Sequence, residues 1–175
     1  MTPKALNEAI HQGKLAEAAE RLEHERDRAQ ARGDRKAAAD VQNDLGVVYY
    51  VVGRLPDARA TLMRARQTFA ELEEPLGQAR AMGNLARVEE KSDNTKAAEK
   101  LYWESAELFH QAGAAEEEFA TMRQLSQLYL KAGGFLQAIA TFDHALLVKP
   151  HRGLREAMLH RIYQVPLRMF GIGSA

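Results

Sequence analysis

The residues of this chain best suited to bind a metal ion or to move a proton are its six histidines. They are His11, His24, His110, His144, His151 and His160. No two of them stand four residues apart, the spacing that would place both imidazoles on one face of a helix. The chain has no cysteine, which excludes disulfides, thiolate zinc sites and cysteine nucleophiles. We therefore expect no metal site.

The motifs that hold a nucleophile or a phosphate group are also missing from the sequence. Serine and histidine both occur, but no G-x-S-x-G elbow arranges them for catalysis. The stretches GAAEEEF and GGFLQA lack the glycine spacing of a phosphate-binding loop. The acidic run EEKSDN lacks the glycine and the alternating ligands of a calcium loop. We expect a protein that is not an enzyme and that needs no cofactor.

The composition fits one soluble domain. The 175 residues are 46% hydrophobic, which is enough for a core, and 24 basic residues balance 24 acidic ones. A net charge of zero disfavours non-specific electrostatic binding to nucleic acid. No apolar run approaches the roughly 18 residues of a membrane helix, and the N-terminal stretch lacks the apolar core of a secretory signal. We expect a cytoplasmic protein.

A period of forty residues organises the sequence. Alanine recurs at one position of every repeat, at Ala18, Ala58, Ala98 and Ala138. Five residues earlier, three repeats have a glycine and one has an aspartate, at Gly13, Gly53, Asp93 and Gly133. The last three repeats share a leucine, at Leu45, Leu85 and Leu125. Four units in one register predict a repeat protein, whose architecture follows from the fold of a single unit.

Each unit is predicted to form two helices separated by a tight turn. In the second repeat, apolar residues three and four apart mark a first helical face, at Ala38, Val41, Leu45, Val48 and Val52. Gly53 follows where that helix must stop, and a second face then runs through Leu55, Ala58, Leu62, Ala65 and Phe69. No strand pattern is present in the sequence. The expected helices span residues 3–12, 15–31, 34–52, 55–73, 75–92, 95–112, 115–132 and 135–148.

A single helical hairpin cannot bury its apolar face alone, so the repeats must stack into a solenoid. We expect an all-α fold that has one domain of four units and a C-terminal extension. The predicted boundaries are residues 1–33, 34–73, 74–113, 114–150 and, for the extension, 151–175.

The C-terminal extension is predicted to begin with a helix. One face of that helix is apolar, at Leu154, Met158, Ile162 and Val165, and we expect it to cap the exposed flank of the last repeat. Pro166 is expected to end the helix. The tail beyond it is expected to expose apolar side chains that could support self-association, namely Leu167, Met169, Phe170 and Ile172.

Two stretches of the sequence resemble the tetratricopeptide repeat (TPR). FLQAIATFDHALLVKP, residues 135–150, is similar to the second helix of that repeat at Ala138, Phe142, Ala145 and Pro150. DLGVVYYVVGRLPDA, residues 44–58, resembles the preceding half at Leu45, Gly46, Tyr49, Gly53 and Ala58. The period exceeds the usual one of about 34 residues, and is similar to the forty-residue subtype of kinesin light chains and of peptide-binding G-protein regulators.

The resemblance implies a right-handed α-solenoid of four helix-turn-helix repeats with a capping helix. The third repeat departs from the pattern, because Glu89 and Asp93 replace the usual tyrosine and glycine. We expect the turn within that repeat to be less regular than the others.

In the family that this chain resembles, the first helix of each repeat lines a concave groove that binds peptides. The positions carried over from repeats two to four are Asn43, Asp44, Val47, Tyr50, Arg80, Asn84, Arg87, Lys91, Arg123, Gln124, Gln127 and Lys131. The first repeat would contribute Asn7 and Ile10. Amide side chains suit the backbone of an extended peptide, and the basic residues of the last two repeats favour an acidic one.

We therefore expect a non-catalytic adaptor or scaffold that binds an extended peptide, or a helix, of another protein in its groove. One alternative is a protein that assembles with itself through the C-terminal segment. A second alternative is a binder of single-stranded nucleic acid. The sequence disfavours it, because Tyr50 is the one well-placed aromatic residue of the predicted groove and base stacking needs several.

Overall fold

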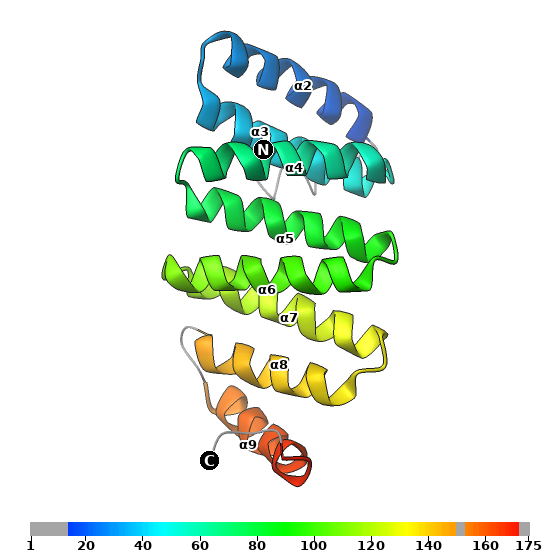
Figure 1. Cartoon of the computed structure of the whole chain (residues 1–175), viewed down its shortest axis with the longest axis vertical. Coiled ribbons are helices and arrows are strands. Elements are labelled where there is room, and N and C mark those ends of the chain that lie inside the picture. The colour runs from blue at the N-terminus through cyan, green and yellow to red at the C-terminus, as the bar shows by residue number, and fades with distance from the viewer. Residues whose placement is uncertain (1–13, 150–152, 172–175) are drawn as a thin grey trace.

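The computed structural model describes residues 14–149 and 153–171. This part of the chain is all-α, contains no strand, and forms a stack of helices in an α-solenoid (Figure 1). Each helix packs against the next one along the chain. The helices are α2 (Leu15–Ala31), α3 (Arg35–Val51), α4 (Leu55–Glu71), α5 (Pro75–Lys91), α6 (Thr95–Gln111), α7 (Ala115–Lys131), α8 (Phe135–Val148) and α9 (Leu154–Met169).

The bounds of α2 to α8 agree with the predicted helices to within two residues. The helix expected at residues 3–12, with Asn7 and Ile10, lies outside the described residues. No helix in the described ranges is long and apolar enough to cross a membrane.

The turns that connect α2 through to α8 share one backbone geometry. Four of them contain a glycine in the left-handed conformation, at Gly33, Gly53, Gly113 and Gly133. Asp93 takes the same conformation, with φ of 59°, although it carries a side chain. The amide of Asn94 donates to the carbonyl of Glu89 at 2.9 Å, as that of Arg54 does to Tyr49 at 2.9 Å. The expectation of a less regular turn in the third repeat is therefore wrong, because Asp93 tolerates the left-handed region.

Three clusters of buried apolar residues lie along the stack between the two layers of helices. They contain recurring leucines and alanines that defined the period, and Leu45, Ala58 and Ala98 are fully buried. Gly46 lets α3 approach α4 closely, because a Cβ at residue 46 would lie 2.5 Å from Cγ of Leu62. The positions that repeat in the sequence are thus the positions where helices of neighbouring layers touch.

The C-terminal helix α9 differs from the prediction in two respects. Pro166 does not end it: α9 continues to Met169, and Leu167, expected to be exposed, is only 3% exposed. Proline removes one backbone hydrogen bond from the last turns of the helix, and the burial of Leu167 against the solenoid compensates for that loss.

The second difference concerns the face of α9 that packs on α8. The predicted capping face is exposed, with Leu154 at 93% and Met158 at 60%. The opposite face lies on α8, where His160 Nδ1 is 2.6 Å from Oδ1 of the buried Asp143. Tyr163 also meets the ring of Phe142 edge-on, at a centroid distance of 5.9 Å. A buried carboxylate with a partner on α9 fixes this orientation, because leaving Asp143 unpaired would be costly.

Candidate functional site

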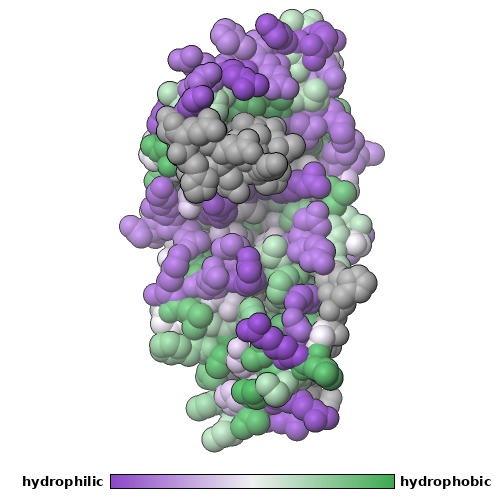
Figure 2. Space-filling view, turned by 180° about the vertical axis from the view of Figure 1, so that it is seen from behind, coloured by the Kyte–Doolittle hydropathy of each residue, from purple (hydrophilic) through white to green (hydrophobic). Residues whose placement is uncertain are grey.

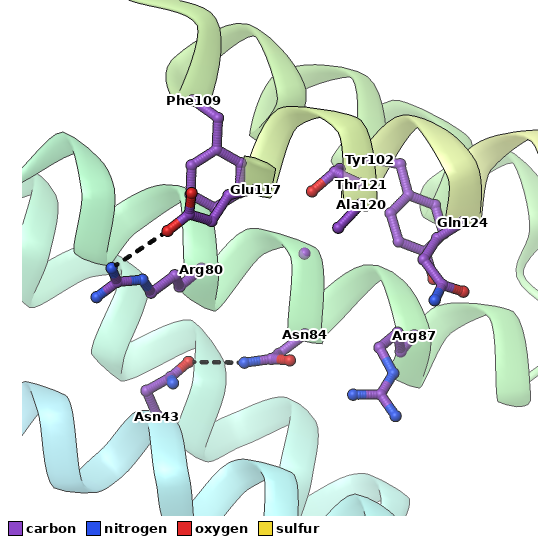
Figure 3. A pocket seen from close by; sticks show the side chains of 11 residues that line it. Asn43, Arg80, Asn84, Arg87, Tyr102, Phe109, Glu117, Ala120, Thr121 and Gln124 are labelled. Carbon is purple, nitrogen blue, oxygen red and sulfur yellow. Dashed lines mark hydrogen bonds and ion pairs between the residues drawn. The ribbon is translucent and has the colours of Figure 1, made fainter. Parts of the chain in front are cut away.

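The first helices of repeats two to four, α3, α5 and α7, line the same face of the solenoid. Between α5 and α7 this face has a hollow of about 250 Å³, with α3 at its edge (Figure 3). Five of the predicted groove residues line it, namely Asn43, Arg80, Asn84, Arg87 and Gln124. Arg80, Asn84 and Arg87 come together because positions four and seven residues apart share one face of α5.

Two asparagines from neighbouring repeats meet at the edge of this hollow. Nδ2 of Asn84 donates to Oδ1 of Asn43 at 3.0 Å, and Figure 3 shows the two side chains pointing toward one another. The bond uses one of the two N–H groups of Asn84, and both amides have further donor and acceptor capacity. Amides held in this way can bind the backbone of an extended peptide, because they present both kinds of hydrogen-bonding group.

A cation–π contact orients Arg87. Its guanidinium lies over the ring of Tyr50, 4.7 Å from the ring centroid, and Nζ of Lys91 lies 4.8 Å from the same centroid. Lys91 also donates to the backbone carbonyl of Tyr50 at 3.3 Å. Because two cations lie against the tyrosine ring, the ring positions positive charge and offers little apolar surface to a ligand.

Ion pairs partly neutralise the basic half of the groove. Arg80 faces Glu117 across the hollow, at 3.7 Å, and Lys131 reaches Glu90 at 2.5 Å. The hydrogen bond to Glu90 raises the pKa of Lys131, which keeps that ammonium charged. Arg87 forms no ion pair with any described residue, so it is the guanidinium of the hollow best placed to meet a new carboxylate.

The other predicted groove residues are spread along the same face. Arg123 and Gln127 are exposed on α7, whereas Val47 and Asp44 are half-buried on α3. Burial raises the pKa of the Asp44 carboxyl. The structure therefore brings the third-repeat residues and their two amide neighbours into one site and leaves Arg123 and Gln127 beside it.

Comparison with known proteins adds to this geometry. Residues 37–111 match the family model of the tetratricopeptide repeat. Residues 37–111 are therefore similar to tetratricopeptide repeats. The matched residues cover α3 to α6, the second and third repeats, which supply Asn43, Arg80, Asn84 and Arg87. No curated protein sequence matches the chain.

Two solved structures share the TPR fold of this chain. A putative kinesin light chain from Podospora anserina with nearly identical TPR-like repeats has a TM-score of 0.65 at 13% identity, and the match covers 97% of this chain and 94% of that one. The protein BtubC (BKLC) from P. vanneervenii has a TM-score of 0.57 at 18% identity, covering 97% of this chain and 80% of that one. These likenesses concern the fold, and they confirm the predicted helical solenoid.

The hollow itself was not predicted from the sequence. At forty-residue spacing Gly83 corresponds to Asn43 and Arg123, so the third TPR has no side chain where its neighbours have a long one. The gap is floored by Tyr102 and Phe109 of α6, which line the hollow from the second layer. A glycine at the position where the neighbouring repeats have polar side chains is the signal that could have predicted the hollow.

The C-terminal residues predicted for self-association do not form one exposed patch. Leu167 is buried, Met169 and Phe170 are exposed, and Ile172 lies outside the described residues. Histidines show no metal-binding arrangement either: no cluster of three or more potential ligands occurs within residues 14–149 and 153–171.

Proposed function

We propose that this protein is an adaptor that binds an extended, acidic segment of another protein in the groove lined by α3, α5 and α7. TPRs generally mediate protein–protein interaction, and they are typically non-catalytic scaffolds. The observation that carries the proposal is the hydrogen bond between Asn43 and Asn84, which joins two repeats beside Arg80 and Arg87.

The role proposed for each residue follows from the chemistry of its side chain. Asn43 and Asn84 would bind backbone amides of the segment, because their bond to each other leaves donors and acceptors on both. Arg87, held over Tyr50, would form a two-point hydrogen bond with an aspartate or glutamate side chain. Gln124, on the far wall of the hollow, would contact the backbone one or two residues further along.

The rigidity of the stack supports this mode of binding. The groove side chains are carried by helices that pack along their whole length, and Asn84 and Arg87 are already held by neighbours in the unliganded chain. A flexible segment would therefore bear most of the ordering cost, while the site itself changes little.

Screening a random library of peptides about 15 residues long against the full chain tests the proposal. The strongest ligands should be enriched in aspartate and glutamate. Their affinities, measured by fluorescence anisotropy, should fall by about tenfold or more in the Asn84→Ala/Arg87→Ala variant.

The matched control is Gln67→Ala/Arg64→Ala. It removes an amide and a guanidinium three residues apart from an exposed face of α4, outside the groove. Its affinities should stay within about twofold of wild type. Ligands without acidic enrichment, or an equal loss in both variants, would contradict the groove assignment.

A further inference from the structure

The outward face of α9 is a row of exposed apolar side chains, here called the α9 stripe. Its members are exposed by 52% to 93%, and they are Leu154, Met158, Ile162, Val165 and Met169. Helical geometry of about 100° per residue places all five within an arc of about 80°, over a length of about 22 Å. Figure 2 shows hydrophobic side chains gathered toward the C-terminal end of the solenoid, where α9 lies.

The α9 stripe has the spacing of a helix-packing face of this solenoid. Forty residues before Met158, Ile162 and Val165 stand Glu118, Met122 and Leu125, all at most 5% exposed. On α7 these positions pack against the helices on either side, with Met122 and Leu125 in one core cluster with residues of α6 and α8. The stripe therefore repeats the pattern by which a first helix of a repeat contacts other helices, but here the pattern faces outward.

The α9 stripe also continues the row of helices. From α2 to α9 each helix covers the next, and the stripe lies opposite the face of α9 that packs on α8. One more helix laid on the stripe would extend the stack by the same kind of contact that holds the rest of the solenoid together.

The borders of the α9 stripe are positively charged. Arg155 lies along one side, and Arg161 and Arg168 lie along the other, all exposed and without an ion pair to any described residue. The single acidic residue of α9, Glu156, is tied to Lys149 at 2.6 Å and to the backbone of Gly153. A helix that covers the stripe would thus meet three guanidinium groups and no available carboxylate.

We propose that the α9 stripe is a docking surface for an amphipathic helix of another protein, with apolar residues on one face and glutamate or aspartate at its edges. Acidic residues are expected at the edges of the partner helix, because each arginine beside the stripe can donate a charge-assisted hydrogen bond to a carboxylate at the rim of the contact. The binding mode is a helix laid against a helix, with apolar anchors three and four residues apart.

A second copy of the chain fits this surface poorly. If two α9 helices met face to face in antiparallel fashion, each border would meet the same border of the other copy, and the two Arg161 side chains, near the middle of the stripe, would face each other. Like charges on both sides of so narrow a contact oppose pairing.

A lipid surface fits it less well than a helix does. Helices that lie in a membrane interface bury a broad apolar face. The apolar arc of the α9 stripe is only about 80° wide, and arginines border it on both sides. A narrow seam between charged borders is the arrangement of helix-to-helix packing.

The test uses the full chain and a designed, fluorescein-labelled helical peptide with leucines along one face and glutamates on both edges. A second peptide carries lysine in place of every glutamate. Wild type should bind the glutamate peptide about tenfold or more tightly than the lysine peptide, measured by anisotropy at low salt. Met158→Glu should weaken binding of the glutamate peptide by about tenfold or more.

Met63→Glu is the matched control, because it makes the same change at an exposed methionine of α4 (52% exposed, against 60% for Met158). It should leave affinity within about twofold, and circular dichroism should show both variants as helical as wild type. Equal binding of the two peptides, or equal effects of the two variants, would overturn the proposal.

Two further arms distinguish other occupants of the α9 stripe. If wild type, but not Met158→Glu, co-sediments with phosphatidylcholine–phosphatidylserine vesicles while neither peptide binds, the stripe is a lipid-binding surface and the proposal is wrong. If sedimentation velocity shows a wild-type dimer that Met158→Glu dissociates, the occupant is a second copy, and the proposal is likewise wrong.

Discussion

Arg59 of α4 and Glu89 of α5 form a two-point ion pair, with Nε donating to Oε1 at 2.5 Å and Nη2 donating to Oε2 at 2.8 Å. Forty residues later the same two positions hold Glu99 and Tyr129, and there the tyrosine hydroxyl donates to the carboxylate at 2.7 Å. The third repeat thus replaces a tyrosine–glutamate contact with a glutamate–arginine one. Glu89 in place of tyrosine is thus accompanied by Arg59 in place of glutamate. The buried Glu89 carboxylate therefore has a partner.

Removing the arginine should destabilise the protein. Arg59→Met leaves the buried Glu89 carboxylate with one side-chain hydrogen-bond donor among the described residues, Nδ2 of Asn94 at 2.8 Å. We expect the free energy of unfolding to fall by about 2 kcal/mol at pH 7, measured by urea denaturation. The double change Arg59→Glu/Glu89→Tyr copies the pair of the fourth repeat and should recover most of the loss. If it is no more stable than Arg59→Met, the two positions are not coupled as described.

The same pair predicts a pH dependence. Burial opposes ionisation of Glu89, but the hydrogen bonds from Arg59 and Asn94 outweigh it and lower the pKa of its carboxyl below the ordinary value of 4.5. A lowered folded-state pKa contributes stability that is present above pH 4.5 and is lost as the pH falls through the folded-state value. The stability difference between wild type and Arg59→Met should therefore be smaller at acidic pH than at pH 7. Urea titrations at both pH values check this, and a constant difference would contradict it.

Alanine should be tolerated less well at residue 46 than at residue 83. A Cβ at residue 46 would overlap the buried Leu62 side chain, so overpacking of about 1–3 kcal/mol should exceed the gain in helix propensity of about 1 kcal/mol. At residue 83 the nearest atom outside α5 is Oγ of Ser105, 3.3 Å away. Thermal unfolding should show Gly46→Ala less stable than wild type and less stable than Gly83→Ala. The reverse order would contradict the close contact between α3 and α4.

Docking of α9 should depend on Leu167 and not on the exposed stripe. Leu167→Ala removes a buried side chain from the α8–α9 contact, which should cost about 2 kcal/mol or more and let α9 open locally. Hydrogen exchange of α9 amides should become faster, while that of α3 to α7 is unchanged. Ile162→Ala, at an exposed position, is the control and should leave α9 protected. Equal exchange in the two variants would show that α9 is held by other contacts.

The sequence predicted the helices well because the period is fixed by the residues that touch between layers. A leucine, an alanine and a left-handed turn residue recur every forty residues. The first two are buried between helices and the third forms the turn, so none of them can move to a neighbouring position. The groove face followed from the same register, which placed Asn84 and Arg87 together.

The C-terminal helix was harder to predict, because an apolar face does not reveal which surface covers it. The pattern of Leu154 and Met158 indicated a buried face, but the pairing of Asp143 with His160 directs the opposite face onto α8. The hollow beside Asn84 was missed for a related reason: it arises from the missing side chain of Gly83 and not from any residue with chemistry of its own.

The regularity of the joints has a consequence for how this molecule can change in length. Helices α2 to α7 each have 17 residues, and three-residue turns connect them through to α8. A forty-residue segment cut at any equivalent turn therefore begins and ends at the same backbone geometry. Duplicating or deleting such a segment would lengthen or shorten the groove, and with it the stretch of a bound peptide that the groove can contact. The new joint would have the same turn geometry as the existing ones.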